Sequence, residues 1–306
     1  MVGERNRVAS ADDTPIQYMQ RTRDYYLALG YGNPYRWAHF SDVPFTPLKR
    51  PLTESTVVLI TTAAPVKPGS NAPRTGAAYS ADLKFYEPWA APSDGGFDLR
   101  INHVAIDYDH TTQEDQASFF PLDALREAAS EGRIGCIAPR VHGAPTNRSQ
   151  RHTIEKDIPT LVERCLADRA DAALLVPNCP ICHQTTALTA RALEEAGIAT
   201  VVMGCAKDIV EHAGVPRFLF SDFPLGNAAG KPNDRESQRA TLAMALDLLE
   251  SATAPRTTVQ SPQIWSDDPA WKDDYSNAAK LTPAEIEERR AALDIIKDEA
   301  KKIRDR

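Results

Sequence analysis

The stretch Leu174-Leu-Val-Pro-Asn-Cys-Pro-Ile-Cys-His183 joins an apolar run to the beginning of a helix. The apolar residues before Pro177 do not alternate with polar ones, which is typical of a strand buried on both faces. A helical pattern follows from about His183 to Ala196. This strand–turn–helix unit predicts an open α/β sheet, a fold that places its chemistry just after the carboxyl ends of its strands.

Similar apolar or β-branched runs recur along the chain, with helical patterns between them. Such alternation is typical of a largely parallel sheet with flanking helices. The predicted fold class is therefore α/β, arranged as one core or as two Rossmann-like lobes. The expected strands are 56–61, 134–138, 172–176, 200–203 and 218–221, and the expected helices are 122–130, 154–167, 185–196 and 206–212.

Changes in composition divide the chain into three expected segments. In residues 1–52 we expect an N-terminal helix, from Pro15 to Leu29, and a proline-rich connector. Residues 53–253 predict the α/β catalytic core, which ends in an amphipathic helix running to about Ser251. Residues 254–306 predict a C-terminal arm with a highly charged last helix. Within the core, residues 66–98 have no period and predict a long loop, although the residues that follow them (99–106) resemble a strand.

The composition favours small-molecule chemistry. A formal net charge of −7 argues against binding to nucleic acid or to an anionic membrane. No run approaches the roughly 18 apolar residues of a membrane span, and residues 1–10 lack the apolar core of a signal peptide, so we expect a cytoplasmic protein. The five cysteines are an odd number, which fits reduced thiols better than a disulfide framework.

Cys179 and Cys182 stand at the expected amino terminus of a helix. The free N–H groups and the dipole of that terminus favour an anion, so a thiol placed there ionises more readily than a free cysteine. A thiolate can act as a nucleophile, a reductant or a metal ligand. The pattern Cys-x-x-Cys-His, completed by His183, also matches haem attachment, dithiol exchange and part of a zinc site, and two small buried residues would explain it equally simply.

A second polar cluster surrounds the strand-like residues 99–106 and contains His103, Asp107, Asp109 and His110. Imidazoles and carboxylates at this density can bind an amine or a carboxylate, or act as general acid and base. Further polar residues follow other expected strands, and the ends of parallel strands converge on one crevice. We therefore predict that these residues bind substrate beside the cysteines: Thr61, Thr62, Arg140, His142, Asn178 and Cys205.

Several motifs, taken in order, resemble the selenoprotein B family of D-proline reductase and glycine/sarcosine/betaine reductase. The resemblance covers roughly residues 40–250 and is strongest to the D-proline reductase branch. It rests on Val43-Pro-Phe-Thr-Pro-Leu48, His103–Thr111, Phe120-Pro-Leu-Asp-Ala-Leu125 with Glu131-Gly-Arg-Ile-Gly135, Cys179–His183 with Ala190–Gly197, and Asp222-Phe-Pro-Leu-Gly-Asn227.

The resemblance implies reductive cleavage of a C–N bond by a selenolate. Carried to this chain, it implies that Cys179 attacks the substrate and that Cys182 resolves the adduct as a disulfide, which an external dithiol reduces. His183, His103 or Asp107 would supply the proton to the leaving group. The family's pyruvoyl group, which activates the amine, would come from a partner subunit.

Two departures from the family pattern bear on the substrate. This chain has cysteine where the reductases use selenocysteine, and Ala63-Ala-Pro-Val66 differs from the glycine- and histidine-bearing stretch expected there. The leading hypothesis is a thiol-dependent reductase or lyase that cleaves a C–N or similar C–heteroatom bond of a small amine- or carboxylate-bearing substrate. We expect a homo-oligomer and assign no metal.

Two alternatives remain open at the level of sequence. A two-cysteine racemase of the aspartate/glutamate kind would need Cys136 or Cys205 to face Cys179. A metal-binding or redox-sensing protein would use the Cys-x-x-Cys-His group itself.

Overall fold

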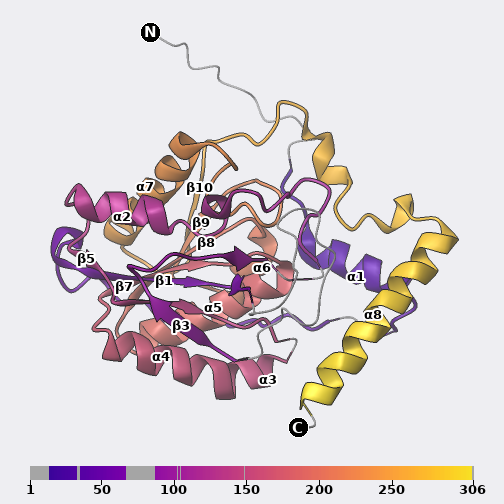
Figure 1. Cartoon of the computed structure of the whole chain (residues 1–306), viewed down its shortest axis with the longest axis horizontal. Helices are drawn as coiled ribbons and strands as arrows, with labels where there is room; N and C mark the ends of the chain where they lie inside the picture. Colours follow the sequence, from indigo (N-terminus) through magenta and orange to yellow (C-terminus); the bar gives the residue numbers. More distant parts are fainter. Residues whose placement is uncertain are drawn as a thin grey trace.

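The computed structural model describes residues 14–304 except 33–34, 67–86, 102, 104 and 148. Most of the predicted loop 66–98 lies outside the described residues, as do the first residues of the chain. The rest forms one large sheet with helices on both faces and a C-terminal helix along one side (Figure 1).

One eight-stranded sheet carries the predicted strands except the one expected within 99–106, in the order β10-β9-β8-β7-β1-β6-β3, with β5 paired to β1. All pairs are parallel except that between β3 and β6. The α/β prediction is therefore confirmed, and a single sheet takes the place of two lobes because β1 pairs with both β6 and β7. The strands are β1 (Thr56–Thr61), β3 (Trp89–Pro92), β5 (Cys136–Ile137), β6 (Arg140–Gly143), β7 (Ala172–Val176), β8 (Ala199–Gly204), β9 (Arg217–Phe220) and β10 (Thr257–Gln260).

Alternate residues of the central strands face two separate layers of helices. Val57 and Leu59 of β1 belong to one apolar cluster, and Val58 and Ile60 belong to the other. Because both faces are covered, the strands are apolar without alternation, which is the pattern the sequence displays. The first cluster includes residues of α2 (Leu122–Ser130) and α7 (Arg235–Ser251), and the second includes residues of α4 (Ile158–Ala167), α5 (Pro180–Glu195) and α6 (Lys207–Ala213).

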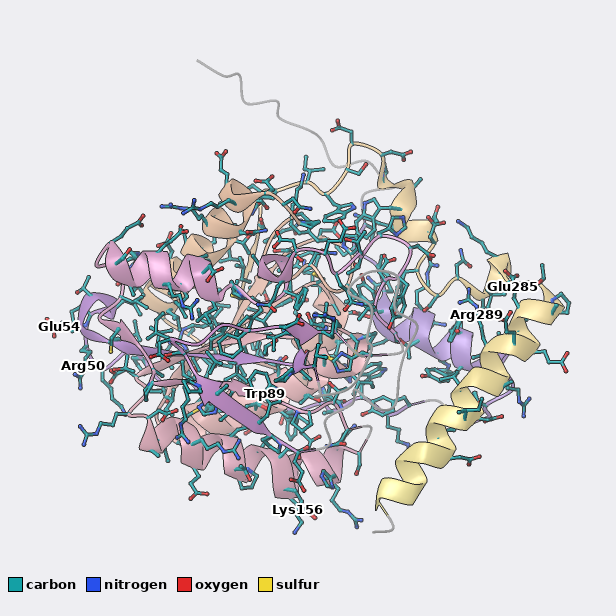
Figure 2. The ribbon with its side chains drawn as sticks, viewed as in Figure 1. Arg50, Glu54, Trp89, Lys156, Glu285 and Arg289 are labelled. Carbon is teal, nitrogen blue, oxygen red and sulfur yellow. The ribbon has the colours of Figure 1, made fainter. Side chains whose placement is uncertain are left out.

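The side chains fill the space between these layers (Figure 2). Trp89 on β3 is 9% exposed and donates its indole N–H to the Ala63 carbonyl at 3.2 Å. A side chain on the facing Gly143 would overlap the indole ring, so this position requires glycine. Charged residues labelled in the same figure lie on the rim, exposed to solvent: Arg50, Glu54, Lys156, Glu285 and Arg289.

The strand expected within residues 99–106 is much shorter. Only Leu99–Arg100 form β4, which pairs antiparallel with β2 (Ala64–Pro65) in a separate two-stranded sheet. From Ile101 onward the backbone leaves the sheet, and the Ile101 N–H donates to the Gln113 side chain at 2.9 Å instead. His103 therefore lies in a loop.

The C-terminal segment contributes to the core as well as to an arm. β10 extends the sheet beside β9, and a short helical turn at Pro269–Asp273 precedes α8 (Pro283–Arg304). α8 crosses the end of α1 (Tyr18–Ala28) (Figure 1), where Tyr31 donates a hydrogen bond to Asp294 at 2.7 Å. In the described residues, no helix has the length and apolar character needed to span a membrane.

Candidate active site

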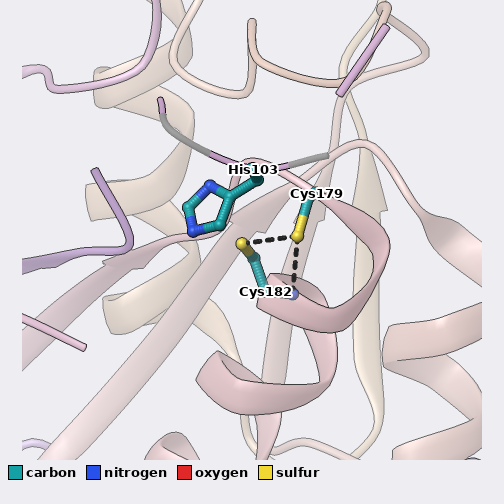
Figure 3. Close-up of side chains that lie close together, drawn as sticks. All are labelled: His103, Cys179 and Cys182. Carbon is teal, nitrogen blue, oxygen red and sulfur yellow. Dashed lines mark hydrogen bonds between the residues drawn. The ribbon is translucent and has the colours of Figure 1, made fainter. Parts of the chain in front are cut away.

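The amino terminus of α5 holds both cysteines just beyond the end of β7. Cys179 is the N-cap residue, and its sulfur accepts the Cys182 N–H at 3.3 Å (Figure 3). Pro180 occupies the first helical position, where a missing N–H costs nothing and the fixed φ suits a helix. The helix thus begins several residues before the predicted start, and Cys182 lies in its first turn.

The two sulfurs are in direct contact. Cys179 Sγ and Cys182 Sγ are 2.8 Å apart, and both residues are buried. Thr146, in the loop after β6, places its hydroxyl 3.0 Å from the Cys182 sulfur. His103 completes the group, with a ring nitrogen within 4.8 Å of each sulfur (Figure 3).

The surroundings of Cys182 favour its thiolate. Burial raises the pKa of a thiol, but hydrogen bonds from Cys179, His103 and Thr146 and the charge of His103 outweigh burial, so the pKa of Cys182 is well below its ordinary value. The helix amino terminus favours the same charge. The two sulfurs are within hydrogen-bonding distance, and the lowered pKa of Cys182 favours its thiolate.

His183 fastens α5 to the end of β8 and does not face the sulfurs. Its Nδ1–H donates to the Cys179 carbonyl at 2.8 Å, and its Nε2 accepts the N–H groups of Cys205 and Ala206 at 2.9 and 3.1 Å. Burial lowers the pKa of His183 to about 4. The prediction that His183 protonates a leaving group is therefore corrected: both ring nitrogens are occupied by backbone groups, and the ring stays neutral.

Asn178 and Thr62 shape the turn next to the cysteines. The Thr62 hydroxyl oxygen accepts both the backbone and the side-chain N–H of Asn178, at 3.1 and 3.0 Å. Asn178 Oδ1 is buried and has no hydrogen-bond partner among the described residues, which leaves a carbonyl-type acceptor for a ligand. Thr61 instead accepts the Ala63 N–H at 3.0 Å and has a structural role.

Asp107 and His110 form a linked pair beside this site. The His110 ring nitrogen Nδ1 lies 3.0 Å from Asp107 Oδ1, and its Nε2 lies 3.5 Å from Asp274. Burial raises the pKa of Asp107, although His110 partly opposes this effect. Asp109 is exposed, so the polar cluster of the sequence divides into a buried part and a solvated part.

Arg140 and His142 do not join the cysteines. Both bind Asp168: Arg140 Nη2 lies 2.8 Å from Oδ1, and His142 Nε2 lies 2.8 Å from Oδ2. Asp168 precedes β7 and therefore lies toward the amino-terminal edge of the strands, opposite the edge that Cys179 follows. Their predicted place in the substrate pocket is corrected, because the ion pair with Asp168 draws both side chains away from it.

Cys136 and Cys205, the two candidates for a second racemase thiol, do not belong to the group of Cys179, Cys182 and His103. Cys136 is exposed, and in the pairing of β5 with β1 it lies opposite Thr56, the first residue of β1. It therefore lies at the amino-terminal edge of the strands, whereas Cys179 follows the carboxyl-terminal edge. Burial, and then the charge of Asp222, raise the pKa of Cys205 well above its ordinary value. A racemase needs two thiols that exchange a proton across a substrate. The position of Cys136 and the raised pKa of Cys205 do not favour either residue as the second thiol.

Two contributors to the site escape sequence reasoning. Thr146 follows a strand, β6, that the sequence pattern does not reveal. Tyr275 belongs to the C-terminal segment, yet it is 3% exposed and donates to the Ala105 carbonyl at 3.0 Å, over the loop of His103. A polar residue after a strand end is the signal that identifies Thr146 once β6 is known.

Comparison with known proteins agrees with the motifs. The chain is 28% identical over 212 residues to the D-proline reductase subunit gamma of Acetoanaerobium sticklandii, covering 67% of this chain and 82% of that subunit. It is 26% identical over 222 residues to the glycine reductase complex component B subunit gamma of Carboxydothermus hydrogenoformans, covering 72% of this chain and about half (49%) of that subunit. No family model and no solved structure matches. Its ordered motifs and these two similarities make the chain a relative of the selenoprotein B family of D-proline and glycine reductases.

Proposed function

We propose that this chain is the dithiol-bearing subunit of a reductase that cleaves a C–N or similar C–heteroatom bond of a small amine- or carboxylate-bearing substrate. The observation that carries the proposal is the contact of the Cys179 and Cys182 sulfurs at 2.8 Å, at the amino terminus of α5. The relatives named as D-proline and glycine reductase subunits support the reaction class.

The chemistry requires two thiols that act in sequence. The first, as thiolate, attacks the substrate carbon, and the C–N bond breaks with its electron pair leaving on nitrogen. The second thiol then attacks the bound sulfur, a disulfide forms, and the released electron pair on carbon takes up a proton. The substrate gains two electrons and two protons, the dithiol loses them, and an external dithiol restores the thiols.

The contacts favour Cys182 as the attacking thiol and Cys179 as the resolving one. Resemblance to the family assigned these roles in the reverse order. Cys182, however, lies in hydrogen-bond contact with the Thr146 hydroxyl and the Cys179 sulfur, and these contacts help to lower its pKa. Because the thiolate is the reactive form, a lowered pKa favours Cys182 as the attacking thiol.

His103 is the proposed proton donor to the leaving nitrogen. It lies within 4.8 Å of both sulfurs, whereas His183 is held by backbone groups and Asp107 is bound to His110. A general acid must reach the atom that it protonates, so position decides among the three candidates.

A partner subunit completes the proposal. One relative is named as a subunit of a glycine reductase complex, and the family resemblance implies a pyruvoyl group on another subunit. Asn178 Oδ1, which has no hydrogen-bond partner within the described parts of the chain, is an acceptor that suits the N–H of an amine substrate. None of the steps above depends on the pyruvoyl group.

The experiment is to trap the covalent intermediate. The chain, isolated from its source cells with its bound subunits, is incubated with D-proline, glycine, sarcosine or betaine, and each cysteine is followed by mass spectrometry. In Cys179→Ser an adduct should accumulate on Cys182, and dithiol-dependent release of amine should fall at least about 10³-fold. Cys136→Ser serves as the control and should turn over normally.

The outcomes separate the hypotheses. An adduct that accumulates on Cys179 in Cys182→Ser reverses the order of attack. Full turnover in both Cys179→Ser and Cys182→Ser eliminates the dithiol mechanism. Solvent deuterium that enters recovered substrate without net reduction would favour an isomerase.

A further inference from the structure

Three soft donor atoms converge at the start of α5. The Cys179 and Cys182 sulfurs and one ring nitrogen of His103 all lie within 4.8 Å of one another (Figure 3). They come from two segments distant in the sequence, so the fold brings His103 to the cysteines. The histidine of the Cys-x-x-Cys-His pattern, His183, is not a member of this group, because backbone groups occupy both of its nitrogens.

The spacing suits a small tetrahedral ion. With metal–sulfur bonds of about 2.3 Å and metal–nitrogen bonds of about 2.0 Å, tetrahedral ligand atoms lie roughly 3.3–3.8 Å apart. The present sulfurs, 2.8 Å apart, would need to separate by about 1 Å. Rotation about the Cα–Cβ bonds of the two cysteines supplies a movement of that size without a change in the helix.

The surroundings stabilise deprotonated ligands. The Cys182 N–H points at the Cys179 sulfur at 3.3 Å, and the Thr146 hydroxyl lies 3.0 Å from the Cys182 sulfur. Hydrogen bonds of this kind to ligand sulfurs orient them and are part of a working metal site.

The imidazole of His103 is buried beside the two sulfurs. His103 is only 9% exposed, and its Nδ1 is buried without a hydrogen-bond partner in the described part of the chain.

We propose that His103, Cys179 and Cys182 bind one thiophilic divalent cation of the Zn²⁺ type, with a fourth position open to water or another ligand. Two thiolates and an imidazole suit zinc and similarly soft ions, whereas Mg²⁺ and Ca²⁺ require oxygen ligands. Three protein ligands and an open position are the arrangement of catalytic zinc sites. The inference does not depend on the proposed reductase, and a bound ion would hold both sulfurs and block dithiol chemistry.

Metal uptake by the reduced full chain tests the proposal. The protein is stripped with a chelator and titrated with Zn²⁺ against a chromogenic indicator. We expect one ion per chain. His103→Gln should weaken binding by at least about tenfold, since a lost ligand should cost no less than a lost supporting contact. Cys136→Ser, which removes the exposed thiol, should bind like the wild type. Co²⁺ in place of Zn²⁺ should give thiolate-to-metal charge-transfer absorption.

A footprint on the unsubstituted chain gives the same answer if a variant fails to fold. Zn²⁺ should slow alkylation of Cys179 and Cys182 at least about tenfold and leave Cys136 unchanged, as read by mass spectrometry. Absence of stoichiometric uptake, uptake lost with Cys136→Ser, or equal protection of Cys136 would overturn the proposal.

Discussion

The Cys182 sulfur shows how a buried thiol can carry a negative charge. It has no exposed surface, and burial alone would keep it protonated. Three donors reverse this preference: the Cys179 thiol, His103 and the Thr146 hydroxyl. A side chain in a loop after β6 therefore helps to lower the pKa of a residue on α5.

Thr146→Val should raise the pKa of Cys182 by about one unit, because it removes one hydrogen bond to the thiolate and leaves the burial unchanged. Cys182 is a thiolate above its pKa and loses that charge as the pH falls through the pKa. In Thr146→Val the pH at which Cys182 loses its reactivity toward alkylation should therefore be higher. Alkylation of Cys182, followed across pH by mass spectrometry, measures the shift. Cys136 in the same sample is the control, and an unmoved midpoint would contradict the role of Thr146.

The residue types of the site are predictable from the sequence, but their roles are not. Cys179 and Cys182 follow a strand and precede a helix, and that local pattern is enough to place them at the carboxyl edge of the sheet. His103 and Thr146 reach them from loops that follow β4 and β6, two strands too short for a clear pattern. The proposed choice of His103 over His183 as the proton donor depends on those distant contacts.

At the scale of elements, His183 joins the first turn of α5 to the end of β8. Gly204 is needed there, because a side chain on it would lie 2.8 Å from the His183 ring. The long central strands, β1 and β7, follow the sequence prediction residue for residue. The sequence pattern does not predict β3, β6 and β10, because four-residue strands with polar or small residues resemble loops.

The stability of the chain should fall between pH 7 and pH 5 because of His183. Its pKa is about 4 in the folded chain and about 6.5 when unfolded, so the unfolded state binds the proton first as the pH falls. The stabilisation is complete above pH 6.5, and roughly 2 kcal/mol should be lost by pH 5. Urea unfolding at both pH values measures this loss. In His183→Gln the pH dependence should be smaller by that amount, and an equal dependence in both proteins would refute the assignment.

The other end of α5 is held by a buried ion pair. Arg217 Nη1 lies 2.9 Å from Glu194 Oε1, and both side chains are fully buried. Arg217→Met should destabilise the chain by about 3–5 kcal/mol, because it leaves Glu194 charged and unpaired. Glu194→Gln combined with Arg217→Met should recover part of that loss in urea unfolding. A double variant less stable than the single one would show that the uncompensated charge is not the cause.

At the scale of the whole molecule, the C-terminal segment covers the loop that carries His103. Trp271 and Tyr275 are 7% and 3% exposed, and Lys272 binds Asp222 at 2.5 Å. Arg21 of α1 donates to the Tyr275 carbonyl at 3.4 Å from the other side. The cysteines are therefore shielded by residues nearly a hundred positions further along the chain, which no local pattern can reveal.

Tyr275→Ala should uncover the site. Removing a buried aromatic ring forfeits several kcal/mol of packing, and here the loss falls on the contact with the loop around Ala105. Hydrogen exchange of residues 105–111 should accelerate at least about tenfold, and alkylation of Cys179 should rise with it. Tyr275→Phe keeps the ring and loses only the hydrogen bond to Ala105. Its exchange and alkylation rates should therefore lie between those of the wild type and those of Tyr275→Ala. Arg289→Ala on the exposed face of α8 should change neither rate. If Tyr275→Ala accelerates exchange throughout the sheet to the same extent, the segment stabilises the whole fold and does not cover the site specifically.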